Sequence, residues 1–308
     1  MIIILNPRSG GGAALRKWRL IERRILADTE VKFVITSSAA EAETATQKQI
    51  DSGEREFIAA GGDGTINALL QTLMRNSALH PGLALGAIGL GSSNDFHKPF
   101  LGKRMERRIP LAMEFANPTP RDVGVLRYTS PDGTELTKYW LLNASVGITA
   151  EANAFFNLES QNHLLGCAKW LHTNAAIYYA AVRTILRYRN CQLQYGLPGS
   201  YHTSRITNLG IVKTPHFAGS FMYDSPFEAG SGSFFAHHVS DLGLVQTLRL
   251  LHGLSNGKFE GFPNSGSFSG EELRIEGAEE FAVEFDGEVI RTIRAHFSIL
   301  KQQILVAS

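Results

Sequence analysis

Three glycines and one acid meet where an apolar strand pattern gives way to a helical one. The apolar run 57–60 leads into Gly-Gly-Asp-Gly-Thr at 61–65, and helix-forming residues follow over 66–74. This order predicts a strand, a tight turn and a helix N-terminus, whose backbone N–H groups favour phosphate. Because a carboxylate among phosphates needs a cation or a proton beside it, Asp63 is placed for Mg²⁺ or for proton transfer. An ordinary βα turn is the alternative, and the missing Gly-Lys-Ser/Thr excludes a Walker A loop.

Two further strand patterns end in small residues that can form hydrogen bonds. The opening run 2–5 turns at Asn-Pro-Arg-Ser-Gly, residues 6–10, and the run 85–90 ends in Gly-Ser-Ser-Asn-Asp-Phe at 91–96. Loops at the carboxyl ends of parallel strands gather along one edge of the sheet, where open α/β folds bind their ligands. We therefore expect the three loops to form one binding site.

The loops are positioned by an alternating pattern of strands and helices through residues 1–120. Strand patterns cover 31–36, 57–60 and 83–89, and a polar helix pattern covers 41–50. Alternation of this kind predicts an α/β domain with a doubly wound parallel sheet.

A second, mainly β domain is expected to begin near Pro120, where Asn-Pro-Thr-Pro breaks the alternation. Residues 121–297 show short strand patterns and hairpin turns, which predict a sandwich-like domain with one or two long helices, the clearest over 163–187. The tail 298–308 is expected to pack back on the first domain. Thirteen of the 18 phenylalanines follow residue 120, where they can fill a core or line an acyl-chain cleft.

Composition narrows the class of protein. The 308 residues are 44% hydrophobic and 19% charged with a net charge of +1, which favours two globular domains and argues against a dedicated nucleic-acid binder. The two cysteines, Cys167 and Cys191, fit a reducing cytoplasm rather than a disulfide framework. We find no signal-peptide pattern and no apolar run near the roughly 20 residues of a membrane helix. If the substrate is a lipid, the protein must therefore visit the membrane surface rather than span it.

Basic residues crowd the segment after the third loop, with one acid, Glu106, among them. They are Lys98, Lys103, Arg104, Arg107 and Arg108. One interpretation is a patch that attracts anionic lipid head groups, worth about 1 kcal/mol per basic residue near a charged membrane. The other is a solvated helix face, which is the more common outcome for a run of charges.

Together the three loops resemble the N-terminal motifs of the diacylglycerol kinase catalytic family, which includes sphingosine and ceramide kinases and bacterial lipid kinases. The matching residues are Asn-Pro-Arg-Ser-Gly at 6–10, Gly-Gly-Asp-Gly-Thr-Ile-Asn at 61–67 and Gly-Ser-Ser-Asn-Asp-Phe at 91–96. Ser92 replaces a more common threonine and keeps the hydroxyl. Asp-Gly-Glu at 286–288 resembles the family's C-terminal motif, so the resemblance extends through nearly the whole chain.

This resemblance implies an ATP- and Mg²⁺-dependent lipid kinase, with a diacylglycerol-like acceptor expected first. It assigns the general base to Asp286, as proposed for bacterial diacylglycerol kinases, or to Asp63, as in sphingosine kinases. It implies a water-linked network of Asp63, Asp95 and Asp122 around the nucleotide Mg²⁺. The residues expected to hold the nucleotide are Asn6, Gly61, Gly62, Gly64, Thr65, Gly91, Ser92, Ser93, Asn94 and Glu288. No lysine follows the glycine loop, so the metal ion must carry more of the charge neutralisation.

Two other functions stay open. An NAD kinase-like enzyme would share the nucleotide fold and the Gly-Gly-Asp-Gly loop, although the motifs at 6–10 and 286–288 argue against it. A non-catalytic protein that binds nucleotide or lipid on this fold is the other. The expected partners are a lipid substrate and anionic lipids, met transiently at the inner face of the membrane from the cytoplasm, with no nucleic acid. The acceptor lipid and the oligomeric state, a homodimer included, stay open.

Overall fold

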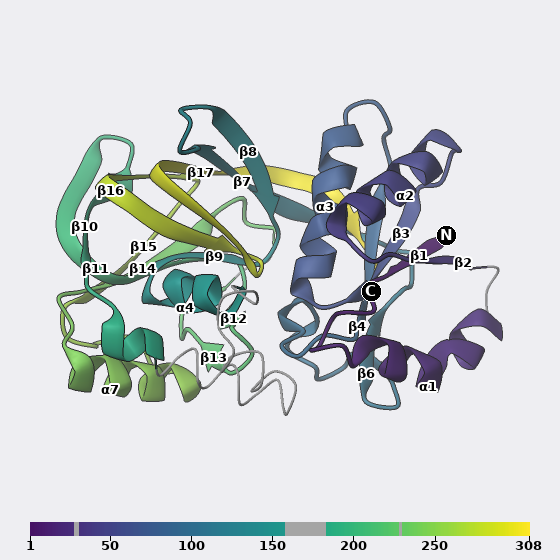
Figure 1. The fold of residues 1–308 in the computed structure, drawn as a ribbon, viewed down its shortest axis with the longest axis horizontal. Helices are drawn as coiled ribbons and strands as arrows, with labels where there is room; N and C mark the ends of the chain where they lie inside the picture. Colours follow the sequence, from purple (N-terminus) through teal and green to yellow (C-terminus); the bar gives the residue numbers. More distant parts are fainter. Residues whose placement is uncertain (28–30, 158–182, 228–229) are drawn as a thin grey trace. The chain divides into compact units, whose positions relative to one another are not determined.

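Figure 1 shows a computed structural model of the chain, which describes residues 1–27, 31–157, 183–227 and 230–308. The chain divides into two compact units. The first consists of Met1–Asp122 with Gln302–Ser308, and the second of Val123–Lys301. The sequence places the corresponding boundary near Pro120 and the returning tail at about 298. None of the helices in the described ranges is long and apolar enough to cross a membrane.

The first unit is built on a parallel sheet with the strand order β2-β1-β3-β4. These strands are β1 (Ile2–Leu5), β2 (Lys32–Ile35), β3 (Glu56–Gly61) and β4 (Ala84–Gly89). The end of β17 (Glu288–Val306) pairs parallel to β4 through Leu305 and Val306. Strand β6 (Ile109–Ala112) pairs antiparallel to β4 further along. Every residue of β1 and β4 is buried, as expected for central strands covered on both faces.

Helices cover both faces of this sheet (Figure 1). They are α1 (Ala14–Ala27), α2 (Ala39–Asp51) and α3 (Asp63–Asn76). Trp18 and Ile21 of α1 pack on Ile3 and Leu5 of β1 in one buried cluster. Helices α2 and α3 are joined by hydrogen bonds between the amides of Gln47 and Asn76.

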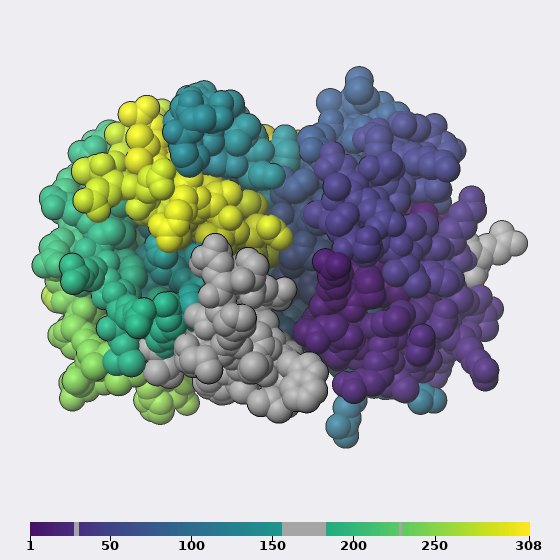
Figure 2. All heavy atoms as spheres, in the orientation of Figure 1, coloured from purple at the N-terminus to yellow at the C-terminus, as the bar shows by residue number. Residues whose placement is uncertain are grey.

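The second unit is an antiparallel β structure with the strand order β15-β14-β11-β10-β16-β17-β7-β8, and β9 pairs with both β11 and β16. The strands are β7 (Thr119–Thr129), β8 (Glu135–Trp140), β9 (Asn143–Gly147), β10 (Cys191–Leu197), β11 (Ser200–Val212), β14 (Phe234–Ser240), β15 (Ser265–Gly270) and β16 (Glu272–Phe285). A short ribbon of β12 (His216–Phe217) and β13 (Phe221–Met222) and the helices α4 (Ile148–Asn157) and α7 (Leu244–Ser255) accompany them. In Figure 2 the yellow hairpin of β16 and β17 forms part of the visible surface of this unit. The prediction of a β-rich second domain is confirmed.

The aromatic residues of this unit mainly fill its interior. Phe234, Phe281, Phe285 and Phe297 belong to one buried cluster together with Trp140. These four phenylalanines therefore belong to the hydrophobic core, which is one of the two roles considered for the phenylalanines of this domain. Most of the helix expected over 163–187 lies outside the described residues, and 183–187 are helical.

The basic segment after the third loop is a hairpin. Arg104–Glu106 form strand β5, which pairs antiparallel with β6. Arg107 and Arg108 make the turn with φ angles of 49° and 66°, the left-handed conformation of a two-residue hairpin loop. The interpretation as a solvated helix face is therefore wrong, because pairing with β6 decides the conformation of this segment.

Candidate functional site

The first two loops of the first unit are tied together by side chains. The Asn6 amide donates to the Thr65 hydroxyl at 3.1 Å, and the Ser9 hydroxyl lies 3.0 Å from the same oxygen. Ser9 also accepts a hydrogen bond from the Gly62 N–H at 3.3 Å. The loop after β1 thus supports the glycine turn at the N-terminus of α3.

The third loop contacts the glycine turn through backbone atoms. The N–H groups of Leu90 and Gly91 donate to the Gly61 carbonyl at 2.8 and 3.0 Å. A Cβ placed on Gly91 would lie 2.5 Å from the Cα of Gly62, which is too close for any side chain. The loops can approach this closely because position 91 is glycine, and the glycines at 61, 62 and 91 put no side chain over their own backbone. The structure therefore brings together the three loops at 6–10, 61–65 and 91–96.

Asp63 is the first residue of α3 and is fixed by the third loop. Its Oδ2 accepts a hydrogen bond from the Asp95 N–H and its Oδ1 from the Phe96 N–H, both at 3.1 Å. A carboxylate at a helix N-terminus is stabilised by the positive end of the helix dipole. Asp63 is thus held in place beside the backbone N–H groups at the start of α3, which suit phosphate.

The side chain of Lys17 on α1 contacts the start of the third loop, and the sequence pattern did not predict this residue as part of the site. Its Nζ donates to the carbonyl oxygens of Leu90 and Gly91 at 3.1 and 2.8 Å. Burial, and secondarily the nearby Arg16, lower the pKa of Lys17 below its ordinary value. The site therefore has a partly buried lysine, although none follows the glycine turn in sequence.

Asn94 and the serines before it complete the third loop. The Asn94 backbone is left-handed, with φ of 50°, and its amide donates to the Gly89 carbonyl at 3.2 Å. Its Oδ1 is buried and has no hydrogen-bond partner within the described part of the chain. A buried acceptor without a donor is costly, so a ligand that supplies an N–H or O–H would relieve it. Ser92 is exposed and Ser93 is half-buried.

Of the three acids expected around Mg²⁺, Asp95 and Asp122 are buried and Asp63 is half-buried, and each has different partners. Asp95 forms an ion pair of 2.6 Å with Lys98. Asp122 accepts a hydrogen bond of 2.8 Å from the Gln302 N–H. Over residues 1–27, 31–157, 183–227 and 230–308, no three His, Cys, Asp or Glu side chains cluster closely enough to hold a metal ion directly. Mg²⁺ usually keeps several waters and takes only one or two carboxylates, so a site for it does not require three clustered acids.

Asp286 lies in the second unit at the tip of the β16–β17 hairpin. Asp286 and Gly287 have φ angles of 47° and 91°, as in a two-residue turn between the paired Phe285 and Glu288. The Asp286 side chain is buried, and three backbone N–H groups donate to it. The donors are Leu141 to Oδ2 at 2.6 Å, and Leu142 and Asn143 to Oδ1 at 2.9 and 3.1 Å. The three donors therefore fix the position of the Asp286 carboxylate, whereas Glu288 is exposed.

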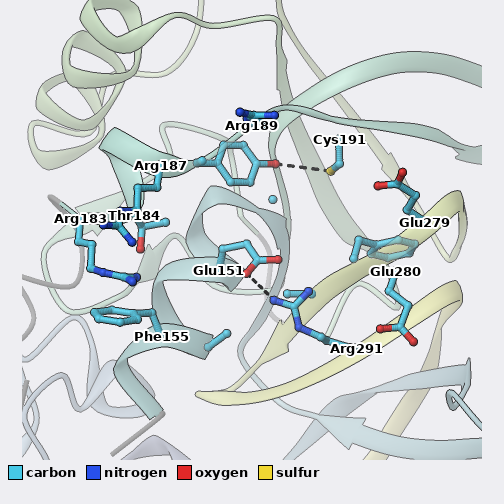
Figure 3. Close-up of a pocket in the computed structure, with 15 residues that line it drawn as sticks. Glu151, Phe155, Arg183, Thr184, Arg187, Arg189, Cys191, Glu279, Glu280 and Arg291 are labelled. Carbon is cyan, nitrogen blue, oxygen red and sulfur yellow. Dashed lines mark hydrogen bonds and ion pairs between the residues drawn. The ribbon is translucent and has the colours of Figure 1, made fainter. Parts of the chain in front are cut away.

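A cavity of about 420 Å³ lies in the second unit beside α4 (Figure 3). Its charged lining consists of Arg183, Arg187, Arg189 and Arg291 with Glu151, Glu279 and Glu280. Arg291 pairs with Glu151 at 2.7 Å, and the Arg183 guanidinium lies 4.0 Å from the centre of the Phe155 ring. Burial raises the pKa of the Cys191 thiol, so that group is poorly suited to act as a thiolate there. The lining suits a polar or charged group better than an acyl chain.

Comparisons with known proteins agree with these motifs. Residues 1–126 match the family model described as diacylglycerol kinase catalytic domain. The chain is 30% identical over 162 residues to a protein of Stenotrophomonas maltophilia named "Probable lipid kinase YegS-like", a match that covers 49% of this chain and 48% of that protein. It is 32% identical over 128 residues to sphingoid long-chain bases kinase 1 of Arabidopsis thaliana, covering 40% of this chain and 17% of that protein. The matches thus span about half the length, or less, of these curated relatives.

The fold is shared over a longer stretch. A crystal structure described as a diacylglycerol kinase from Bacillus anthracis superposes with a TM-score of 0.66 and 15% sequence identity, and the match covers 99% of this chain and 95% of that chain. At this identity the likeness shows the fold alone.

Proposed function

We propose that this chain is a lipid kinase of the diacylglycerol kinase catalytic family, which transfers the γ-phosphate of ATP to a lipid hydroxyl, because residues 1–126 match that family's model and a relative is named a probable lipid kinase. The observation that carries the proposal is the geometry of the first unit. An acid, Asp63, is fixed at a helix N-terminus, in a turn whose glycines place no side chain over the backbone N–H groups. Phosphoryl transfer depends mainly on position and charge stabilisation, which this arrangement supplies.

The nucleotide is assigned to the edge formed by the three loops. Backbone N–H groups at the start of α3 would bind phosphate oxygens. Lys17 would add positive charge at the same edge, and the buried Oδ1 of Asn94 would accept a hydrogen bond from the nucleotide. Mg²⁺, when bound, would neutralise charge on the phosphates, with Asp63 and Asp95 as its protein-side acids and water completing its shell.

We assign the general base to Asp286, with Asp63 as the rival. An alcohol needs a base to remove its proton in the transition state, and a carboxylate is a suitable one. Three backbone donors hold the Asp286 carboxylate in one position. The acceptor is proposed to be diacylglycerol-like, because the family match and the lipid-kinase relatives point to a lipid alcohol.

The test is transfer of label from γ-³²P-ATP with Mg²⁺ to a panel of acceptors, followed by organic extraction and chromatography. The panel contains diacylglycerol, a sphingoid base, ceramide and phosphatidylglycerol in mixed micelles, with NAD as a soluble acceptor. We expect label in the organic phase, and most of it with diacylglycerol. Label only on NAD would identify the NAD kinase-like alternative, and label on neither would leave the non-catalytic one.

A further inference from the structure

A continuous exposed segment, residues 99–105, follows the site loop in the first unit. It combines large apolar side chains with cations instead of the polar residues usual in a surface loop. Leu101 is 93% exposed, and Phe100 and Met105 are 42% and 43% exposed. Exposure of several large apolar side chains in one short segment is a sign of an interaction surface.

The segment presents Leu101 on a closed turn. The Lys103 N–H donates to the Phe100 carbonyl at 3.1 Å, and Gly102 has a φ of +77°. A four-residue turn with this hydrogen bond and glycine at its third position places Leu101 at the outermost corner. The turn is thus preformed, and contact with a partner costs little ordering of the backbone.

The charges around this turn are almost all positive. The exposed cations are Lys103, Arg104, Arg107 and Arg108. In the described part of the chain these four form no ion pair. The one acid of the hairpin, Glu106, is half-buried and pairs with Arg24 at 3.0 Å. The hairpin therefore complements a negatively charged surface.

We propose that Phe100 and Leu101 insert into the head-group layer of an anionic lipid bilayer while the hairpin cations lie on the phosphates. This inference rests on the proposed lipid kinase function, because an acceptor lipid stays in its bilayer and the enzyme must come to it. A protein partner would need roughly 800 Å² on each side, far more than one turn offers. A small apolar tip among cations is sufficient for a bilayer, where burial and charge attraction add.

The position of the turn links docking to the site. Phe96 donates its N–H to Asp63, and Lys98 pairs with Asp95. Only a few residues separate these contacts from Leu101. Insertion of the turn would bring the phosphate-binding loops to the lipid surface.

The experiment measures co-sedimentation of the full chain with vesicles, in the absence of ATP. Vesicles of phosphatidylcholine alone are compared with vesicles that also contain phosphatidylglycerol. The variant is the double substitution Phe100→Ser with Leu101→Ser. Its matched control is Leu79→Ser, which removes another exposed leucine (79% exposed) of the same unit, away from the basic hairpin. A second variant, Arg107→Glu with Arg108→Glu, reverses charge and keeps the apolar turn.

We expect the wild type and Leu79→Ser to bind anionic vesicles and the double serine variant to bind at least about tenfold more weakly. Charge reversal should also weaken vesicle binding. Added salt should abolish vesicle binding of the serine variant at a lower concentration than that of the wild type, because salt screens the cations and leaves apolar insertion intact. Turnover on a short-chain acceptor dissolved as monomers should be unchanged in the serine variant. That readout separates failure of docking from failure of the proposed kinase activity.

Equal binding of the wild type and the serine variant would overturn the proposal, as would equal loss in Leu79→Ser. A change of oligomeric state in the serine variant, without a change in vesicle binding, would assign the turn to a second copy of this chain and also overturn it.

Discussion

The carboxylate of Asp63 is joined to the backbone of Asp95, whose N–H lies 3.1 Å from Oδ2. The other oxygen, Oδ1, accepts the N–H of Phe96 at the same distance. These two bonds hold the loop after β4 against the glycine turn after β3. The acid cannot turn away from the phosphate-binding backbone without breaking both, so its position is a property of the fold and does not depend on a ligand.

The first prediction concerns Asp63→Asn. One accepting oxygen becomes an amide that faces a backbone donor, and the negative charge is lost. We expect lipid phosphorylation to fall about 10²-fold or more, in the range typical for loss of an acid–base group. The control is Asp51→Asn at the exposed end of α2, which should leave turnover unchanged. Normal turnover by a folded Asp63→Asn protein would contradict the assigned role.

A second prediction concerns Lys17→Met, which keeps the length of the side chain and removes its charge. Two carbonyl oxygens lose their donor, at a cost of about 1–3 kcal/mol in the free energy of unfolding. We also expect the affinity for ATP to weaken, since positive charge near the phosphates is lost. Calorimetric titration with ATP and denaturant unfolding measure the two effects. Arg23→Met on the exposed face of the same helix is the control, and equal ATP affinity in both variants would refute the role of Lys17.

The third prediction is a pH dependence that arises from His97. The ring is 1% exposed, and in the described part of the chain neither ring nitrogen has a hydrogen-bond partner. Burial, helped by Lys103, lowers the pKa of His97 to about 4. Between pH 4 and about 6.5 the unfolded chain binds this proton and the folded chain does not. The free energy of unfolding should therefore fall as the pH falls through this window, by up to about 3 kcal/mol from this group.

His97→Phe tests this prediction, because it fills a similar volume and cannot be protonated. We expect the variant to lose less stability than the wild type between pH 6.5 and pH 4, the two ends of the His97 window. Urea unfolding at a series of pH values gives the comparison. Buried His237 has a similarly low pKa of about 4 and remains in both proteins, so only the difference between them reports on His97. Identical pH dependence would show that His97 does not contribute.

Much of the site could be predicted because its signals are local. A glycine-rich turn between a strand pattern and a helix pattern defines both the turn and the start of α3. Parallel pairing then brings the ends of β1, β3 and β4 to one edge. Lys17 could not be predicted, because its hydrogen bonds reach carbonyls 73 and 74 residues away. Lys17 is one of several basic residues on the amphipathic helix α1, and its spacing does not distinguish it from the others.

The basic hairpin shows a different limit. Its composition fits a solvated helix, and the usual Asn-Gly or Asp-Gly turn code is absent from Arg107 and Arg108. Pairing of Arg104–Glu106 with Ile109–Ala112 decides the strand, and that pairing depends on β6 lying along β4. The cations of the proposed docking surface are visible in the sequence, whereas the exposure of Leu101 on its turn appears only in the folded chain.

The last prediction concerns Asp286→Asn. Asparagine tolerates the left-handed φ of 47° at this turn, so the hairpin should persist. The amide group cannot replace both accepting oxygens, and the loss of a buried acceptor for the Leu141 N–H should lower the free energy of unfolding by roughly 1–3 kcal/mol. If Asp286 is the general base, turnover at saturating lipid should fall by about 10²–10⁴-fold with ATP affinity nearly unchanged.

The chain offers a matched control in its other Asp-Gly hairpin turn. Asp132 precedes Gly133 between β7 and β8, is exposed, and accepts a hydrogen bond from the Thr134 N–H at 3.0 Å. Asp132→Asn should therefore lose little of either stability or turnover. If Asp286 only stabilises the β16–β17 turn, Asp286→Asn should lower the free energy of unfolding while turnover per folded molecule stays normal. If Asp63 is the base, Asp63→Asn should reduce turnover more than Asp286→Asn does. Wild-type turnover by folded Asp286→Asn would remove Asp286 from the chemistry and leave Asp63 as the base.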